Sequence, residues 1–459
     1  MYDLQDEFRD FVLAQAQRDL EFVQREIHFM SANCAKEGLN FEVPVQPLFL
    51  SQSLLNQYKE FGNLVHHVLN QVLKVLKNPL DPHYFEMKSL LRMDHEIEEI
   101  LHCEIMNRGR YGPGVVRPDT VLSGNGFQAH EFNVSWPGGI ADADIIHKVL
   151  STNTLFVRFM EEMHKRGVAI MLPEENGTSR RLLNELLMNS EVDDPHIALM
   201  HPRPYTVDES DLHLARYLED FIREQGHQVS LVHPDQLEVS GHKVRFDGRE
   251  IDVAYRFFEW HHVVQDPGFL GYRKVLRAAM NGDLIVVNSF ASEALSAKSI
   301  FEVIWDDSFL QIFDEEVIAA IRPFIPRTFN LAKAGTDDLE EIIEDKDNWV
   351  IKPVKGSSGM QVFLGSLVDD VEFFRQLVYQ SKANGEMVAQ EYVQTPELNV
   401  VEGQEDGISQ ATHYLDINPF YIGGGLAGFF ARWSRTRMTA ACSPGWGGMY
   451  PVVAYDNLI

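Results

Sequence analysis

Two short polar motifs lie close together in the chain and could hold a metal ion beside an anion. Arg117-Pro-Asp119 places an arginine and a carboxylate one residue apart, and Glu131-Phe-Asn133 places a carboxylate and an amide likewise. In a β-strand, residues i and i+2 point to the same face, so two strands joined by a turn at 123–126 would gather these groups on one surface. Carboxylate and amide oxygens suit Mg²⁺, and a guanidinium pairs bidentately with phosphate or carboxylate. The competing interpretation is a hairpin with an Arg–Asp salt bridge on its solvent face.

A second candidate feature is a small-residue loop between two apolar segments. The pattern predicts strands at 349–354 and 361–364, with Lys352 near the end of the first. The loop between them contains Gly356, Ser357, Ser358 and Gly359. Small residues let backbone N–H groups approach phosphate oxygens closely. The loop lacks the Walker pattern, and a strand rather than a helix follows it, so taken alone it predicts only a hairpin.

The order of these features resembles a known superfamily. Lys298 on a predicted helix, the strand lysine Lys352, the glycine-rich loop and a strand ending at 390–393 follow one another as in ATP-grasp proteins. The closest resemblance is to the circularly permuted branch, which includes glutathionylspermidine synthetase and eukaryotic glutathione synthetase. In the former, an Arg-x-Asp is followed twelve residues later by a Glu-x-Asn, and twelve residues separate Asp119 from Glu131 here. The resemblance covers about residues 110 to 440.

The resemblance implies a role for each matched residue. Asp119, Glu131 and Asn133 resemble Mg²⁺ ligands, and Arg117 resembles the residue that holds the transferred phosphoryl group or acyl phosphate. Nucleotide contacts are implied for Lys298, Lys352, the loop from Gly356 to Gly359, Gln390, Glu391, Tyr392 and Val393.

The sequence also departs from the family pattern. In glutathione synthetase a glutamate inside the glycine-rich loop binds metal, whereas this loop has Lys355 nearby and no acidic residue. Asp416-Ile-Asn418 offers a second acid-x-Asn, which is either a further metal ligand or a turn before Pro419. Of these two, the turn is the favoured prediction.

Further residues are candidates for contacting the substrates. Arg432 would hold a substrate carboxylate or the acyl intermediate, and a surface salt bridge is an equally weighted interpretation. Ser135 and Trp136 follow the metal motif directly, and Arg256 ends a predicted strand that would point at the same cleft.

Composition limits the function classes. The 459 residues carry a net charge of −28, which argues against a nucleic-acid partner because phosphate backbones need a positive surface. Three widely spaced cysteines indicate neither a disulfide framework nor a zinc site. The first residues lack a signal-peptide core, and no run of about 18 apolar residues exists, so we expect a cytoplasmic protein that does not enter a membrane.

The predicted fold class is α/β (α+β), an ATP-grasp fold with a preceding Rossmann-like α/β subdomain and an N-terminal helical region. Helices are expected at 3–38, from Ser51 or Ser53 onward, from 81 to about 108, and at 141–165. Alternating strands and a helix between 196 and 255 predict a parallel sheet. The expected domains are an N-terminal helical region at 1–110, a metal-motif hairpin with helices at 111–195, an α/β substrate domain at 196–290, and nucleotide-binding subdomains with the lid and tail at 291–459.

The resemblance implies an ATP-dependent carboxylate–amine ligase with ATP and Mg²⁺ as cofactors. A carboxylate would attack the γ-phosphorus of ATP, and an amine would attack the resulting acyl phosphate, giving an amide, ADP and phosphate. Two alternatives stay open, a thiol acceptor such as a carrier protein and a nucleotide-binding scaffold without catalysis. Amino acids, small peptides and polyamines are all compatible substrates, and members of the family are often homodimers.

Overall fold

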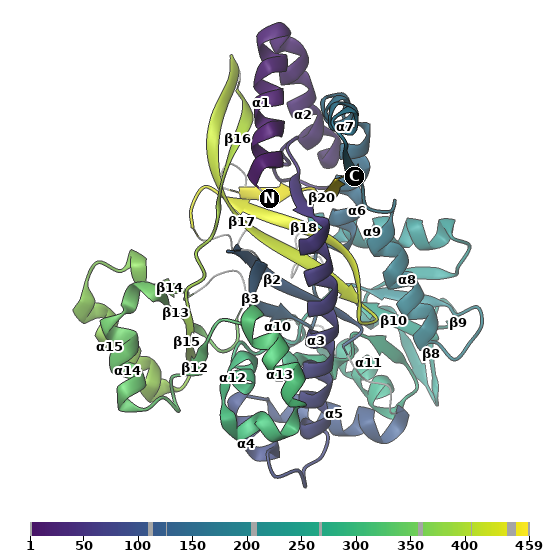
Figure 1. Cartoon of the computed structure of the whole chain (residues 1–459). Helices are drawn as coiled ribbons and strands as arrows, with labels where there is room; N and C mark the ends of the chain where they lie inside the picture. The colour runs from purple at the N-terminus through teal and green to yellow at the C-terminus, as the bar shows by residue number, and fades with distance from the viewer. Residues whose placement is uncertain are drawn as a thin grey trace.

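The computed structural model describes residues 2–108, 113–124, 126–202, 209–265, 269–356, 361–404, 406–437 and 447–457. Figure 1 shows a large body of sheets flanked by helices, with a smaller α/β unit standing to its left. Both labelled chain ends lie in the upper part of that view. Within the described residues, no helix is long and apolar enough to cross a membrane.

The N-terminal region is helical, but three of the expected helices are each divided in two. The predicted helix at 3–38 is split into α1 (Tyr2–Arg18) and α2 (Leu20–Lys36) at Asp19, whose side chain accepts a hydrogen bond from the Phe22 amide. Asn153 separates α6 (Ile140–Thr152) from α7 (Thr154–Lys165) with the same kind of hydrogen bond, accepted by its side chain from the Phe156 backbone N–H. Asp and Asn side chains compete for backbone N–H groups, so they begin a new helix in place of continuing the old one.

The third divided helix gives α4 (Tyr84–Leu90) and α5 (His95–Arg108). By contrast, α3 (Gln52–Leu76) is one helix of 25 residues, and Ser51 caps it by accepting from the Leu54 amide, as predicted. It crosses the middle of the molecule in Figure 1.

The central sheet carries both sequence motifs. Its strand order is β19-β18-β17-β2-β3, with β16 also pairing with β17. The predicted hairpin is present as β2 (Val115–Ser123) and β3 (Gly126–Asn133), and its register sets Arg117 opposite Asn133 and Asp119 opposite Glu131. The glycine-rich tail supplies the other strands, which are β16 (Glu397–Gln404), β17 (Gly407–Ile422), β18 (Gly425–Ser434) and β19 (Gly447–Tyr450).

The predicted parallel sheet is also present. Its order is β11-β10-β5-β6, and all three pairings are parallel. The strands are β5 (Ile197–Met200), β6 (Val229–Val232), β10 (Val253–Arg256) and β11 (Ile285–Val287). Helices α8 (Gly177–Asn189) and α9 (Glu209–Glu224) contact its strands, and α10 (Trp260–Gln265) and α11 (Phe269–Asn281) lie between β10 and β11 in the sequence. A separate meander holds β7 (Glu238–Ser240), β8 (Lys243–Phe246) and β9 (Arg249–Glu250).

The smaller unit has its own sheet, ordered β12-β15-β13-β14. Its strands are β12 (Thr328–Asn330), β13 (Trp349–Pro353), β14 (Phe363–Leu364) and β15 (Met387–Glu391). α14 (Thr336–Glu344) and α15 (Val371–Asn384) cover it, and Trp349, Phe374 and Val378 belong to a hydrophobic cluster separate from the main core. The short helices α12 (Ile300–Trp305) and α13 (Glu315–Ile321) precede it. A further sheet, β1-β20-β4, combines β1 (Leu48–Ser51), β20 (Val452–Asn457) and β4 (Val168–Met171).

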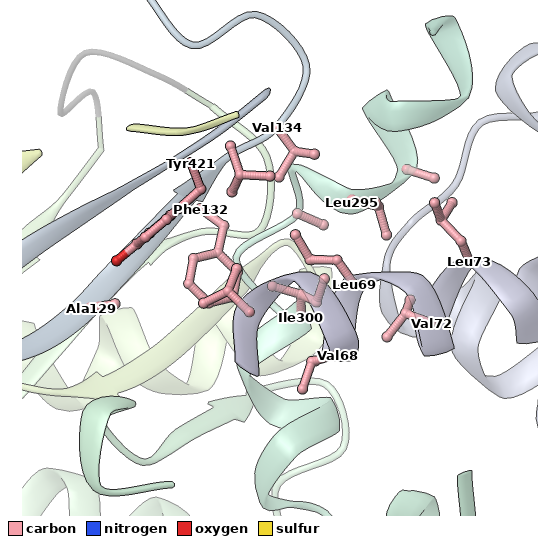
Figure 2. Packing of buried hydrophobic residues seen from close by; sticks show 14 of the residues in the cluster. Val68, Leu69, Val72, Leu73, Ala129, Phe132, Val134, Leu295, Ile300 and Tyr421 are labelled. Carbon is pink, nitrogen blue, oxygen red and sulfur yellow. The ribbon is translucent and has the colours of Figure 1, made fainter. Parts of the chain in front are cut away.

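The largest core forms where α3 packs on the central sheet. Figure 2 shows Leu69 and Val72 of α3 beside Ile300, with Phe132 and Val134 from the β3 side of the cluster. All of these side chains are buried. Those of α3 form one apolar stripe, because the helix repeats apolar residues at three- and four-residue intervals. Tight packing of this kind holds β3, and the polar motif on it, in a fixed position.

Candidate active site

A cleft of about 470 Å³ lies between the central sheet and the smaller unit. β2, β3, β17 and β18 contribute polar side chains from one side, and β13, β15 and the segment after it contribute from the other. Of the residues proposed from the sequence, the lining includes Arg117, Asp119, Glu131, Asn133, Trp136, Lys298, Lys352, Gly356, Gln390, Glu391, Tyr392, Val393 and Arg432. The structure therefore brings together two groups of residues that are more than 150 positions apart in the sequence.

Asp119 is the centre of the charged network on the central sheet. Its Oδ1 accepts from Arg117 Nε at 3.0 Å and from Asn133 Nδ2 at 3.0 Å, and its Oδ2 accepts from Arg432 Nη2 at 2.6 Å. Arg117 also donates to the Gly138 carbonyl. Burial pushes the pKa of Asp119 upward, but the guanidinium groups of Arg117 and Arg432 outweigh it and hold the pKa below its usual range. The carboxylate is therefore ionised at neutral pH.

Glu131 is paired with a lysine from a distant segment. Lys298 Nζ lies 2.8 Å from Glu131 Oε1 and donates to the Gly356 carbonyl at 2.6 Å. Burial raises the pKa of Glu131, whereas Lys298 lowers it, and the net direction is down. Lys298 thus joins the carboxylate motif to the start of the glycine-rich loop.

Lys298 lies in a turn between a 3₁₀ helix, Phe290–Leu295, and α12, so the prediction that it sits on a helix is wrong. Its backbone N–H donates to the carbonyl of Val354, the residue that follows β13. Because the Lys298 backbone N–H is used in this tertiary hydrogen bond, it does not donate to a carbonyl four residues earlier as it would in an α-helix.

Lys352 on β13 makes its polar contacts with neutral oxygens. Its Nζ donates to the His130 carbonyl and to Gln390 Oε1, each at 2.7 Å, and Gln390 in turn donates to Thr328. Lys352 is 5% exposed. Burial lowers its pKa, an effect that Glu131 offsets in part, and the resulting pKa is about 7. An anion bound beside Lys352 would stabilise its protonated form and raise its pKa again.

The oxygen atoms present fit a hard divalent cation. Asp119 and Glu131 are paired across the hairpin, Asn133 is hydrogen-bonded to Asp119, and both carboxylates are ionised. Mg²⁺ accepts such a mixture of carboxylate and amide oxygens while sharing its remaining positions with substrate phosphates and water. The described residues contain no group of three His, Cys, Asp or Glu side chains suited to a metal. The candidate set is therefore two carboxylates completed by an amide.

Two proposed substrate residues lie behind the wall of the cleft, which corrects their expected position. Arg256 is fully buried, and its guanidinium donates to Glu293 and to the Asn288, Ser289 and Phe258 carbonyls. Ser135 donates to the same Glu293 carboxylate. Arg256 is the last residue of β10, and its side chain points into the packed interior. There it joins β10 to the segment at 288–293 through hydrogen bonds. Ser357, Ser358 and Gly359 lie outside the described residues.

The structure contradicts the favoured prediction for Asp416 and places Arg432 at the cleft, in line with one of its two alternatives. Asp416-x-Asn418 lies within β17 and both residues are fully buried, so the predicted turn before Pro419 is wrong. β17 continues through Pro419 because Pro419 is opposite Phe429 in a long antiparallel pair. Arg432 bridges Asp416 and Asp119, with 2.6 Å to an oxygen of each, so it belongs to the cleft and not to a surface salt bridge.

Sequence reasoning missed a polar cluster at the cleft, formed by Glu259, His261 and His262. Glu259 and His261 are 3.1 Å apart, and the rings of His261 and His262 lie 3.9 Å apart between centroids. The Glu259 carboxylate raises the pKa of His261, whereas burial lowers that of His262 to about 4. The position of these residues just after β10 was an available signal, since ligands gather beyond the carboxyl ends of parallel strands.

Comparison with known proteins identifies the family. The glutathionylspermidine synthase preATP-grasp model matches residues 181–445, which is more than half of the chain and begins after the hairpin motif. No curated protein matches. Among solved structures, a glutathione synthetase-like effector from Globodera pallida in its apo form has a TM-score of 0.61 at 11% identity, covering 91% of this chain and 95% of the other. A structure described as a putative gamma-glutamylcysteine synthetase from Methylobacillus flagellatus has a TM-score of 0.41 at 14% identity, covering 81% and 86%. The fold is therefore shared with a glutathione synthetase-like protein, and the chain belongs to the glutathionylspermidine synthase preATP-grasp family.

Proposed function

We propose that the protein is an ATP-dependent carboxylate–amine ligase that forms an amide through an acyl phosphate and releases ADP and phosphate. The observation that carries the proposal is the meeting, in one cleft, of Asp119, Glu131 and Asn133 with Lys298 and Lys352. Carboxylates that hold Mg²⁺ and lysines that contact phosphate are the two charge types that phosphoryl transfer from ATP requires.

Each group has a distinct task in this scheme. Asp119, Glu131 and Asn133 would hold Mg²⁺, which when bound neutralises charge on the β- and γ-phosphates. Lys298 and Lys352 would contact the phosphates, and Glu391 to Val393 would meet the adenine and ribose. Arg117 would stabilise the transferred phosphoryl group, because its guanidinium borders the metal motif.

Arg432 would orient the attacking carboxylate. Its Nη2 already lies between two carboxylates, Asp119 and Asp416, which fixes the guanidinium plane before substrate binds. Pre-organised charge costs no rearrangement at the moment of reaction. The amine then attacks the acyl phosphate in a cleft from which water has been excluded.

The test is ADP release with Mg²⁺, ATP, carboxylates and an amine acceptor. Hydroxylamine serves as a general acceptor because it converts an acyl phosphate into a stable hydroxamate, and the family description makes glutathione with spermidine the first natural pair to assay. ADP and hydroxamate should appear together and in equal amounts. If no carboxylate raises ADP release above background, the ligase proposal is wrong.

Glu131→Gln provides the matching variant. Losing one ionised metal ligand should abolish ADP release, while the amide keeps the shape of the side chain. Glu340→Gln is the control, because Glu340 pairs with Arg375 on the outside of the smaller unit. Circular dichroism should show both variants folded, and turnover by Glu131→Gln at the wild-type rate would contradict the metal assignment.

A further inference from the structure

A second cavity adjoins the cleft and was not anticipated from the sequence. This side chamber has a volume of about 440 Å³. Arg117, Trp136, Gly138 and Arg432 line both cavities and so form their common wall. A molecule that reaches across this wall would place one end beside Asp119 and the other end in the side chamber.

Most of the side chamber is apolar. Its lining includes Phe41, Leu214, Leu218, Phe257, Phe430 and Met449. The charged residues in its described lining are Arg117, Arg432 and Asp142, and at the common wall Arg117 is paired with Asp119 and Arg432 with Asp119 and Asp416. An apolar pocket with a few convergent polar groups is the usual form of a small-molecule site.

Backbone N–H groups converge on the same wall. Helix α6 starts there, with Gly139 as its N-cap and no side-chain cap. Gly139 has a φ of +98°, and a Cβ at this position would lie 2.4 Å from the Phe430 ring. A capping Ser or Asp is therefore excluded at position 139. An anion at the wall would lie at the positive end of the α6 dipole, where Asp142 of the first turn is the carboxylate already present.

A buried hydroxyl in the chamber wall also lacks a partner. Tyr255 is 1% exposed, and its hydroxyl has no hydrogen bond within the part of the chain that the structure describes. Burial raises the pKa of Tyr255, whereas its neighbours Arg256 and Arg117 lower it, so the hydroxyl lies within electrostatic range of the common wall. An unpaired buried hydroxyl is costly, and a ligand oxygen would satisfy it.

We infer that the side chamber binds the body of the carboxylate substrate, and that this substrate is an acid with a compact apolar or aromatic body. The inference rests on the proposed ligase function for the fate of the carboxylate. That carboxylate lies at the common wall, where Arg432 orients it and where the start of α6 and the Tyr255 hydroxyl are its other neighbours, and from there it faces the phosphate end of the cleft. The apolar body packs between Phe257, Leu218 and Met449.

Binding is measured by calorimetry on the full chain without ATP, so that the result does not depend on turnover. The probes are 3-phenylpropionate, its neutral amide, 3-phenylpropylamine and glutathione. The acid should bind at least about tenfold more tightly than each of the other three, because only the acid combines an apolar body with a carboxylate. No detectable binding of the acid, or tighter binding of glutathione or of the amine, would overturn the assignment.

Two variants locate the binding. Leu214→Trp enlarges a partly exposed side chain of the chamber wall and should weaken acid binding at least about tenfold, whereas Leu20→Trp, at an exposed leucine outside the chamber, should not. Tyr255→Phe should weaken acid binding about tenfold without lowering the unfolding midpoint of the free protein, because it removes an unsatisfied hydroxyl. Equal acid affinity in the wild type and in Leu214→Trp would refute the chamber as the site.

ADP release measured on the same preparations separates this inference from the ligase proposal. Acid binding in the chamber without ADP release would support the chamber and contradict the ligase. ADP release that needs a carboxylate, together with acid affinity unaffected by Leu214→Trp, would overturn the chamber and leave the ligase proposal standing.

Discussion

The two walls of the cleft handle their charges in opposite ways. On the central sheet, Asp119 is paired with Arg117 and Arg432, and Asp416 is paired with Arg432 as well. On the smaller sheet, Lys352 contacts only neutral oxygens among its hydrogen-bond partners, those of His130 and Gln390. The pKa of Asp119 is accordingly held low by its partners, while burial lowers that of Lys352 to about 7.

This difference predicts that changes on one wall act mainly on folding stability and changes on the other wall mainly on affinity for an anionic ligand. A buried ion pair adds little net free energy of folding, because desolvation offsets the attraction, but removing one partner leaves the other buried and unpaired at a large cost in stability. A buried cation without a paired carboxylate is costly in the free protein and is relieved by an anionic ligand. The charges of Asp119, Asp416 and Arg432 on the central sheet are therefore balanced before any ligand binds, whereas under the proposed function Lys352 on the smaller sheet would gain its counter-charge from the nucleotide.

The largest expected effect is the loss of stability in Asp119→Ala. Arg117 and Arg432 would both lose a carboxylate partner inside the wall, which should cost about 3–5 kcal/mol of unfolding free energy. Denaturant unfolding followed by tryptophan fluorescence measures it. Glu340→Ala, which breaks an exposed pair with Arg375, should cost at most about 1 kcal/mol. A similar loss in both variants would remove the distinction between the two walls.

Lys352→Met should show the opposite pattern. MgATP affinity should fall at least about tenfold because a phosphate-contacting charge is lost. The unfolding free energy should change less than in Asp119→Ala, because losing two hydrogen bonds is offset by removing a buried amine. Calorimetry gives the affinity and denaturant unfolding gives the stability. The comparison fails if Lys352→Met is as unstable as Asp119→Ala and still binds MgATP normally.

MgATP affinity should also depend on pH through Lys352. With a pKa of about 7 in the free protein, Lys352 is charged below pH 7 and must take up a proton to bind phosphate above it. The dissociation constant should therefore rise above pH 7, approaching about tenfold per pH unit. In Lys352→Arg the guanidinium stays charged and this slope should disappear. Identical slopes in the two proteins would show that another group titrates.

The smallest effect concerns Glu302, which connects α12 with β12 of the smaller unit. This α12 residue is 7% exposed, and its carboxylate accepts a hydrogen bond from the backbone N–H of Asn330 in β12. Burial raises its pKa to about 7, so its ionisation destabilises the folded state progressively from about pH 4.5 to 7. Glu302→Gln keeps the acceptor and should raise stability at pH 8 by about 1–3 kcal/mol, with little change at pH 4. Thermal unfolding at both pH values checks it, and an equal effect at both would contradict the assigned cause.

Local sequence patterns predicted the elements of the site better than their surroundings. The hairpin at 115–133 and the strands β5, β6 and β13 follow from period-two alternation and short apolar runs. The helix breaks at Asp19 and Asn153 were missed because the apolar spacing continues across them, while their side-chain caps start new helices. The placement of Lys298 was missed because a hydrogen bond to Val354, 56 residues later, determines it.

By itself, the sequence determined that Arg117 and Asp119 share one face of a strand, and likewise Glu131 and Asn133, because side chains alternate along a strand with a two-residue period. The two pairs lie on the same face only through the β-bulge between Asp119 and Thr120, since the unshifted register of the tight hairpin would set Asp119 opposite His130. Only the tertiary structure decided which residues complete that face. Asp416 and Arg432 reach Asp119 because β17 pairs with β2, and Lys352 reaches the His130 carbonyl because a separately packed sheet lies against the hairpin. Arg256 lies outside the cleft for the same reason, since its guanidinium is enclosed by Asn288 and Glu293, which no local sequence pattern connects to it. Strand pairing over hundreds of residues depends on the packing of whole faces, and a short motif does not contain that information.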